Sequence, residues 1–155
     1  MMLPVLLALL VQSSTINGSL VSPQGAVAPT SAQVVLLPNE YAQMFNAEAQ
    51  KRIDNYWEAY KPEFAEHKES FSQAFALAYR DALDVVLSRM RRDSKVDSGG
   101  LVRSAAGGHF EFRGVPPGDY KIVATGSIQS VVYVWTEALH MASAPILIQM
   151  KTRVP

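Results

Sequence analysis

The sequence has 155 residues, of which 48% are hydrophobic and 18% charged, and its formal net charge at pH 7 is zero. This length holds one domain, or one domain with an insertion, and the composition is that of a globular chain rather than a disordered one. A neutral chain lacks the basic surface that binds a phosphate backbone, so we expect no nucleic-acid partner. The absence of cysteine excludes disulfides, thiolate metal ligands and a cysteine nucleophile.

An apolar run from Leu3 to Val11, interrupted by Pro4, lies near the N-terminus and is followed by small polar residues from Ser13. The run is too short for a membrane-spanning helix, which needs about 20 residues. Its order is that of a secretory signal peptide, although no basic residue precedes it. We therefore expect a signal peptide at residues 1–13, a secreted, periplasmic or other cell-envelope location, and no stable membrane insertion after cleavage. A buried first strand is the alternative interpretation.

Short β-prone segments separated by glycine and proline lie on both sides of the middle of the chain, a pattern typical of a sandwich or barrel. They predict strands at 16–21, 33–37, 109–113, 120–125, 130–135 and 146–151. In the segment 109–113, Phe110 and Phe112 alternate with polar residues, so we expect both rings on the buried face.

The middle of the chain, from Asn39 to about Lys95, holds ten of the 14 acidic and nine of the 14 basic residues. Apolar residues recur there at steps of three and four, the period of an amphipathic helix. They are Phe45, Ala49, Ile53, Tyr56, Tyr60, Phe64, Phe71, Phe75, Ala78, Ala82 and Val86, with His67 on the same stripe. Pro62 interrupts the pattern, and because a proline inside a helix costs about 3 kcal/mol, we expect a kink or a break near Tyr60. The sequence leaves open whether this insertion, residues 39–98, is one bent helix or a helical hairpin.

The flanking segments carry a recognisable pattern. Residues 16–21 form a predicted strand that contains Gly18, and a turn at Gly25 leads to the apolar strand at 32–37. The stretch 108–124 has a glycine, two alternating phenylalanines, a Pro-Pro-Gly turn and a tyrosine that begins the next strand. Both stretches resemble carboxypeptidase regulatory-like domains, and the second is the most typical part of that pattern.

The resemblance implies a transthyretin-like or immunoglobulin-like antiparallel β-sandwich of about seven strands. This sandwich would comprise residues 14–155, interrupted by the helical insertion at 39–98. The resemblance also implies no catalysis, because in the metallocarboxypeptidases this module accompanies the enzyme domain and does not carry the zinc. Similar modules in bacterial surface proteins are accessory or adhesive. Family members usually have a short loop where this chain has the insertion, so the resemblance does not say what the insertion does.

No catalytic or metal-binding motif is visible in the sequence. The three histidines, His67, His109 and His140, lack metal-ligand spacing, and there is no nucleophile elbow, Walker loop or dinucleotide fingerprint. We therefore expect no enzyme, no cofactor and no metal. We expect His67 to be packed on the helical stripe or to reach from it toward solvent, His109 to be solvated and His140 to lie in a loop.

Tyr133 and Trp135 are the candidate binding residues. In the strand predicted at 130–135 they share one face, and Val132 and Val134 share the other. Two neighbouring rings on an outer face would form a platform on which a sugar could stack. The other interpretation is that the helical insertion covers these rings, because an aromatic stripe on a helix needs a surface to pack against.

The function that the sequence favours is a non-catalytic, exported structural or protein-interaction module of the bacterial cell envelope. Its partner would be another protein or a second copy of itself, contacted through the helical insertion. The alternative is a carbohydrate-binding accessory module that holds a glycan on Tyr133 and Trp135.

Overall fold

A computed structural model describes residues 13–23, 31–96 and 101–152, so the predicted signal peptide lies outside the described residues except for Ser13. Within these ranges the chain forms seven strands and two α-helices, with one 3₁₀ turn between the helices. The elements are β1 (Ser14–Val21), β2 (Ser31–Pro38), α1 (Asn39–Tyr60), η1 (Lys61–Glu63), α2 (Lys68–Arg92), β3 (Val102–Ala106), β4 (His109–Val115), β5 (Gly118–Ile128), β6 (Val131–Met141) and β7 (Ile146–Lys151).

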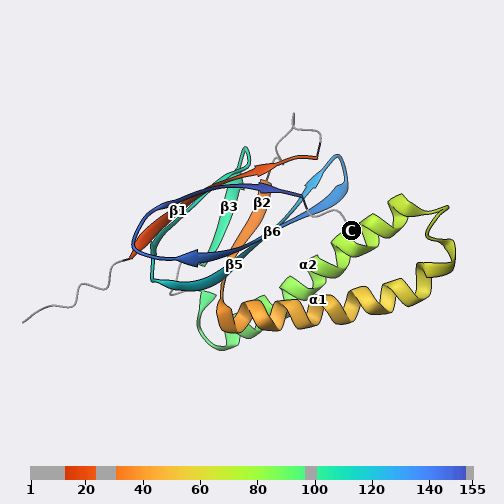
Figure 1. Ribbon diagram of the computed structural model, residues 1–155, viewed down its shortest axis with the longest axis horizontal. Coiled ribbons are helices and arrows are strands. Elements are labelled where there is room, and N and C mark those ends of the chain that lie inside the picture. The colour runs from red at the N-terminus through yellow and green to blue at the C-terminus, as the bar shows by residue number, and fades with distance from the viewer. Residues whose placement is uncertain (1–12, 24–30, 97–100, 153–155) are drawn as a thin grey trace, which may run out of the picture.

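The strands are hydrogen-bonded in the order β6-β5-β2-β3-β4-β1-β7. The sheet curls over into two layers around a common interior (Figure 1), and a bridge between Trp135 and Thr152 joins its two ends. Neighbouring strands are antiparallel except β1 and β7, which are parallel. The fold is therefore a β-sandwich with a helical insertion, which confirms the predicted class.

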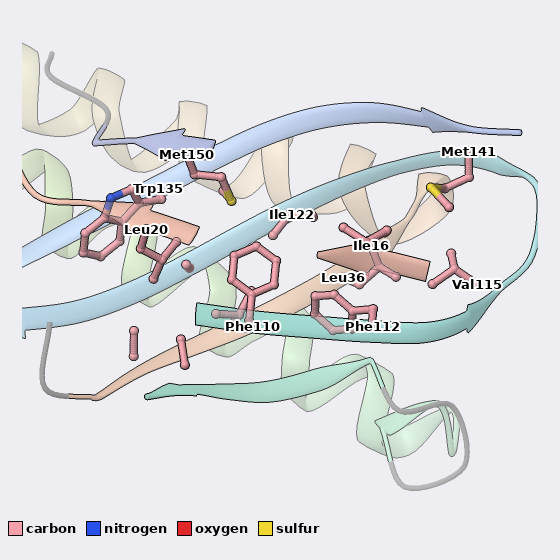
Figure 2. Close-up of a cluster of buried hydrophobic side chains, with 14 residues drawn as sticks. Ile16, Leu20, Leu36, Phe110, Phe112, Val115, Ile122, Trp135, Met141 and Met150 are labelled. Carbon is pink, nitrogen blue, oxygen red and sulfur yellow. The ribbon is translucent and has the colours of Figure 1, made fainter. Parts of the chain in front are cut away.

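The sandwich interior is filled by side chains from both layers (Figure 2), among them Ile16, Leu20, Leu36, Phe110, Phe112, Val115, Ile122, Trp135, Met141 and Met150. Phe110 and Phe112 are both buried, with ring centroids 5.8 Å apart, as their alternation predicts. The turn that follows is closed by the Tyr120 hydroxyl, which donates to the Pro116 carbonyl oxygen at 2.9 Å. These residues belong to the stretch that resembles carboxypeptidase regulatory-like domains.

Strand β2 is buried on both of its faces. Val34 and Leu36 point into the sandwich interior, while Val35 and Leu37 belong to a second apolar cluster under the helices. All four side chains are at most 1% exposed. This is why residues 34–37 form a continuous apolar run instead of alternating with polar residues.

The helical insertion is a hairpin rather than one bent helix. Helix α1 ends at Tyr60, η1 carries Pro62, and α2 runs back alongside α1 (Figure 1), so the chain breaks where the proline predicts. The hairpin packs on the outer face of β2, β5 and β6, and its far end projects past the sheet (Figure 1).

Gly18 of β1 lies directly opposite Phe110 of β4, and the ring occupies the space that a side chain would need. A Cβ atom at this position would lie 2.1 Å from Cζ of Phe110. We predict that Gly18→Ala lowers the free energy of unfolding by about 1–3 kcal/mol, the usual cost of an overpacked core. Chemical denaturation measures this loss, with the neighbouring outward-facing Asn17→Ala as control. A Gly18→Ala variant as stable as Asn17→Ala would contradict the packing.

Candidate functional site

The near half of the hairpin is anchored by an apolar cluster between the helices and the sheet. Val35, Leu37, Val123 and Val134 of the strands are all buried in this cluster. On the helix side they meet a larger set of buried residues, namely Tyr41, Ala42, Phe45, Ala49, Tyr79, Ala82, Leu83, Val86, Leu87 and Met90. Because this packing fixes the hairpin along the sheet, it also fixes where the projecting end is held.

The base of the hairpin is closed by a hydrogen bond between its two ends. The buried Tyr41, at the start of α1, donates its hydroxyl hydrogen to Oδ2 of Asp93, just after α2, at 2.7 Å. Arg89 lies 3.4 Å from the same carboxylate oxygen. The bond to Asp93 together with burial raises the pKa of Tyr41 to about 12, and the same bond lowers the pKa of Asp93.

The far end of the hairpin is an aromatic cluster, which we call the aromatic tip: Trp57, Tyr60, Phe64, Phe71 and Phe75. Phe71 is its centre, with ring centroids 4.3 Å from Phe75, 4.9 Å from Phe64 and 5.3 Å from Trp57. Trp57 also meets Phe64 edge-on at 5.6 Å. Such edge-to-face pairs stabilise a cluster beyond simple area burial.

The aromatic tip is only partly covered by the protein. Of its five side chains only Phe71 is buried, Tyr60 is 38% exposed, and the other three are half-buried. Exposed charged residues of both signs lie next to it in the sequence, and Nζ of Lys68 lies 6.0 Å from the centroid of Phe64. An apolar centre with a charged rim is the usual composition of a protein-binding surface.

A groove of about 500 Å³ runs between α2 and the first residues of β6. Its strand side consists of Val131, Val132, Tyr133 and Val134, and its other walls are formed by Lys68, Glu69, Ser72, Gln73, Ala76, Pro23 and Thr152. The side chain of Gln73 crosses the groove and hydrogen-bonds the backbone of Val132. The groove thus has an apolar floor and a polar bridge to the edge of the sheet.

The structure does not contain the outward-facing platform that Tyr133 and Trp135 were expected to form. Trp135 is fully buried in the sandwich interior (Figure 2), and its indole Nε1–H donates to the Val21 carbonyl oxygen at 2.9 Å. The helices cover the opposite face, through Val134, so the alternative that they cover these rings is also wrong. A strand with a ring face and an aliphatic face can bury either one, and here the larger rings fill the interior while the aliphatic face meets the helices. Tyr133 remains half-buried and lines the groove.

The histidines do not converge on a common site. His109 is exposed, as predicted, but His67 is exposed just before α2 rather than packed on the stripe. His140 lies in β6 rather than in a loop, and its Nδ1 is 2.6 Å from Oδ1 of Asp119. Across the three described ranges there is no group of three or more metal-ligating side chains. In the same ranges, neither helix has the length and apolar character needed to span a membrane.

Two residues of these surfaces were not predicted from the sequence. Trp57 is adjacent in the sequence to Tyr56, which belongs to the predicted stripe. It joins the aromatic tip only because the chain reverses at Pro62. Gln73 is a polar residue that the helical pattern does not predict to be buried. It has a hydrogen-bond partner outside the helix only because β6 lies beside α2. The aromatic content of residues 56–75 was the one signal that could have indicated the tip.

No family model matches the sequence, and neither does any curated protein. Among solved structures, the chain is similar to the major pilin subunit of Bacillus cereus, with 9% identity, a TM-score of 0.42, and coverage of 92% of this chain and 30% of that one. It is also similar to the pilus backbone protein of Streptococcus pneumoniae, with 15% identity, a TM-score of 0.33, and coverage of 84% and 34%. The chain thus spans about a third of the length of these two structures. The resemblance to carboxypeptidase regulatory-like domains stays a prediction.

We predict that Tyr41→Phe lowers the free energy of unfolding by about 1–2 kcal/mol at pH 7, because it removes a hydrogen bond to a carboxylate. Folding raises the pKa of Tyr41 from 10.0 to about 12, so its contribution is present below pH 10 and lost as the pH rises toward 12. The difference between the two proteins should therefore shrink between pH 10 and 12.

Chemical denaturation at pH 7 and at pH 11 measures this difference. Tyr60→Phe, which removes an exposed hydroxyl, is the matched control and should have little effect at pH 7. Equal stability of Tyr41→Phe and wild type at pH 7 would show that the base of the hairpin does not depend on this bond.

Proposed function

We propose that this chain is an exported, non-catalytic structural module of the bacterial cell envelope, which contacts another protein through the aromatic tip of its helical hairpin. One observation carries the proposal: the tip gathers five aromatic side chains at the far end of the hairpin and buries only Phe71. Aromatic residues in partly covered clusters contribute most of the binding energy in many protein interfaces.

The anchoring of the hairpin supports this function. Because the near half is packed on β2, β5 and β6 and its base is closed by the Tyr41–Asp93 bond, the tip is held in a fixed position relative to the sandwich. A partner that binds a pre-organised surface does not have to order it, which improves affinity. The tip is therefore better suited to binding than an equally apolar mobile loop.

Export and family membership belong to the same proposal. The apolar run at 3–11 supports export, and the stretch 108–124 supports membership of the carboxypeptidase regulatory-like domains. In that stretch the two phenylalanines lie in the interior, and the tyrosine hydroxyl closes the proline–glycine turn. This is the physical role that we expect for each residue type of the pattern.

Site-specific photo-crosslinking in the producing cell tests the proposal. A photoreactive p-benzoylphenylalanine replaces Tyr60 at the tip or, in the control protein, Leu147, which is 87% exposed on the outer face of β7 away from the hairpin. We expect a discrete crosslinked protein from position 60, either a second copy or another envelope protein, and none from position 147. The mass of the uncrosslinked protein from the envelope fraction should correspond to a chain that begins near Ser14.

Equal crosslinking from both positions, or none from position 60, would contradict docking at the tip. Recovery of the protein from the cytoplasm with Met1 intact would contradict export, independently of the crosslinking result.

A further inference from the structure

The first residues of β6 form one wall of the groove beside α2. Since β6 is the last strand of the sheet, its backbone pairs with β5 on one side, while its other side faces the groove and, further along, the bridge from Trp135 to Thr152. Backbone groups along such an edge can pair with another extended chain. The groove adjoins the aromatic tip, because Lys68 lies near Phe64 and also lines the groove, but β6 and Gln73 are not part of the tip.

Gln73 occupies the place that a neighbouring strand would take. Its Oε1 accepts a hydrogen bond from the N–H of Val132 at 3.2 Å, and its Nε2 donates to the carbonyl oxygen of Val132 at 3.4 Å. A side-chain amide has the same donor and acceptor as a peptide group. The exchange of two bonds with one residue is also the pattern of a hydrogen-bonded antiparallel pair.

These two bonds are longer than the usual 2.9–3.0 Å of an N–H···O bond. They also involve the end of a flexible side chain that is itself only half-buried. A backbone segment could therefore take the place of Gln73 and make shorter bonds with Val132. The apolar side chains beside it, including Val131 at 41% exposure, would then be covered by the side chains of the added strand.

We propose that this groove binds one extended segment of a partner protein, which displaces Gln73 and adds to β6 as an antiparallel strand. Such strand addition obtains affinity from main-chain hydrogen bonds and specificity from alternate side chains. Thr152 already meets Trp135 further along this edge in the antiparallel direction, so the proposed segment continues the pairing that the edge already has. The partner segment therefore needs a free backbone edge and apolar side chains at alternate positions.

A single strand fits this place better than the sheet edge of a second copy. Helix α2 forms the opposite wall, and Lys68, Ser72 and Gln73 lie across from the strand residues. A second sandwich would bring its whole layer into α2, whereas one extended segment can lie between the helix and β6.

Peptide binding to the full chain tests the proposal, with a fluorescein-labelled, acetylated seven-residue peptide of alternating valine and threonine as the probe. Fluorescence anisotropy measures its Kd for the wild type and for three variants. Gln73→Ala removes the side chain that competes for Val132 and should lower Kd about tenfold. Val132→Pro removes the N–H that faces the groove and should raise Kd about tenfold. One or two net hydrogen bonds account for a change of about tenfold in Kd. Proline is tolerated on the open side of an edge strand. The matched control is Gln50→Ala, at an exposed glutamine of α1 that does not line the groove, and it should leave Kd unchanged.

Amide hydrogen exchange at Val132 provides a readout that does not need the proline variant to fold: the probe should slow this exchange in Gln73→Ala. Failure of the probe to bind Gln73→Ala, or to slow this exchange, would overturn the proposal. Equal affinity for wild type, Gln73→Ala and a folded Val132→Pro would also overturn it. Dimerisation of Gln73→Ala without peptide would overturn the assignment to a partner, because the occupant would then be a second copy.

Discussion

The burial of β2 on both faces is the constraint on which the rest of the structure depends. Val34 and Leu36 fill the sandwich interior, and Val35 and Leu37 fill the contact with the helices. Burying one such aliphatic side chain contributes about 1.5–3 kcal/mol. A strand with this pattern cannot face water on either side, so the sandwich and the hairpin each complete the burial of the same strand.

This shared strand explains how a small sandwich holds a long helical insertion in one position. The chain passes from Pro38, the last residue of β2, directly into α1 at Asn39, and the hairpin then lies along the face that β2 shares with β5 and β6. The far end of the hairpin projects past the sheet (Figure 1), so the aromatic tip is covered only in part, although Phe75 still packs against the cluster between helices and sheet. The proposed partner contact follows from that overhang, since the tip covers itself around Phe71 but not completely.

Much of the fold could be predicted from the sequence because the local signals agree with the tertiary structure. Three local patterns each favour a single conformation, and the structure has that conformation in each case. They are the alternation of Phe110 and Phe112, the break at Pro62 and the turn before Tyr120. The face of β6 could not be predicted in this way. Both of its faces are apolar, and the choice depends on which one the helices approach.

The surfaces that carry the proposals were harder to predict than the core. Trp57 and Gln73 acquire their contacts only when α2 returns along α1 and passes the edge of β6. No local pattern encodes that approach, because it results from the length of the hairpin and its angle to the sheet. The short strand β3 lacked a signal of its own for a similar reason, since its pairing with β2 spans the whole insertion.

Deletion of the insertion tests the central claim most directly. The chain would be joined from Pro38 to Gly99 by a short Gly-Ser turn, with residues 39–98 removed, and its association state and unfolding would be measured by sedimentation and chemical denaturation. Because Val35, Leu37, Val123 and Val134 would face water, the shortened sandwich should aggregate or lose cooperative unfolding. Replacing Val35 and Leu37 with threonine in the same protein should restore a folded monomer. A shortened sandwich that stays monomeric with wild-type stability, without those replacements, would contradict the account.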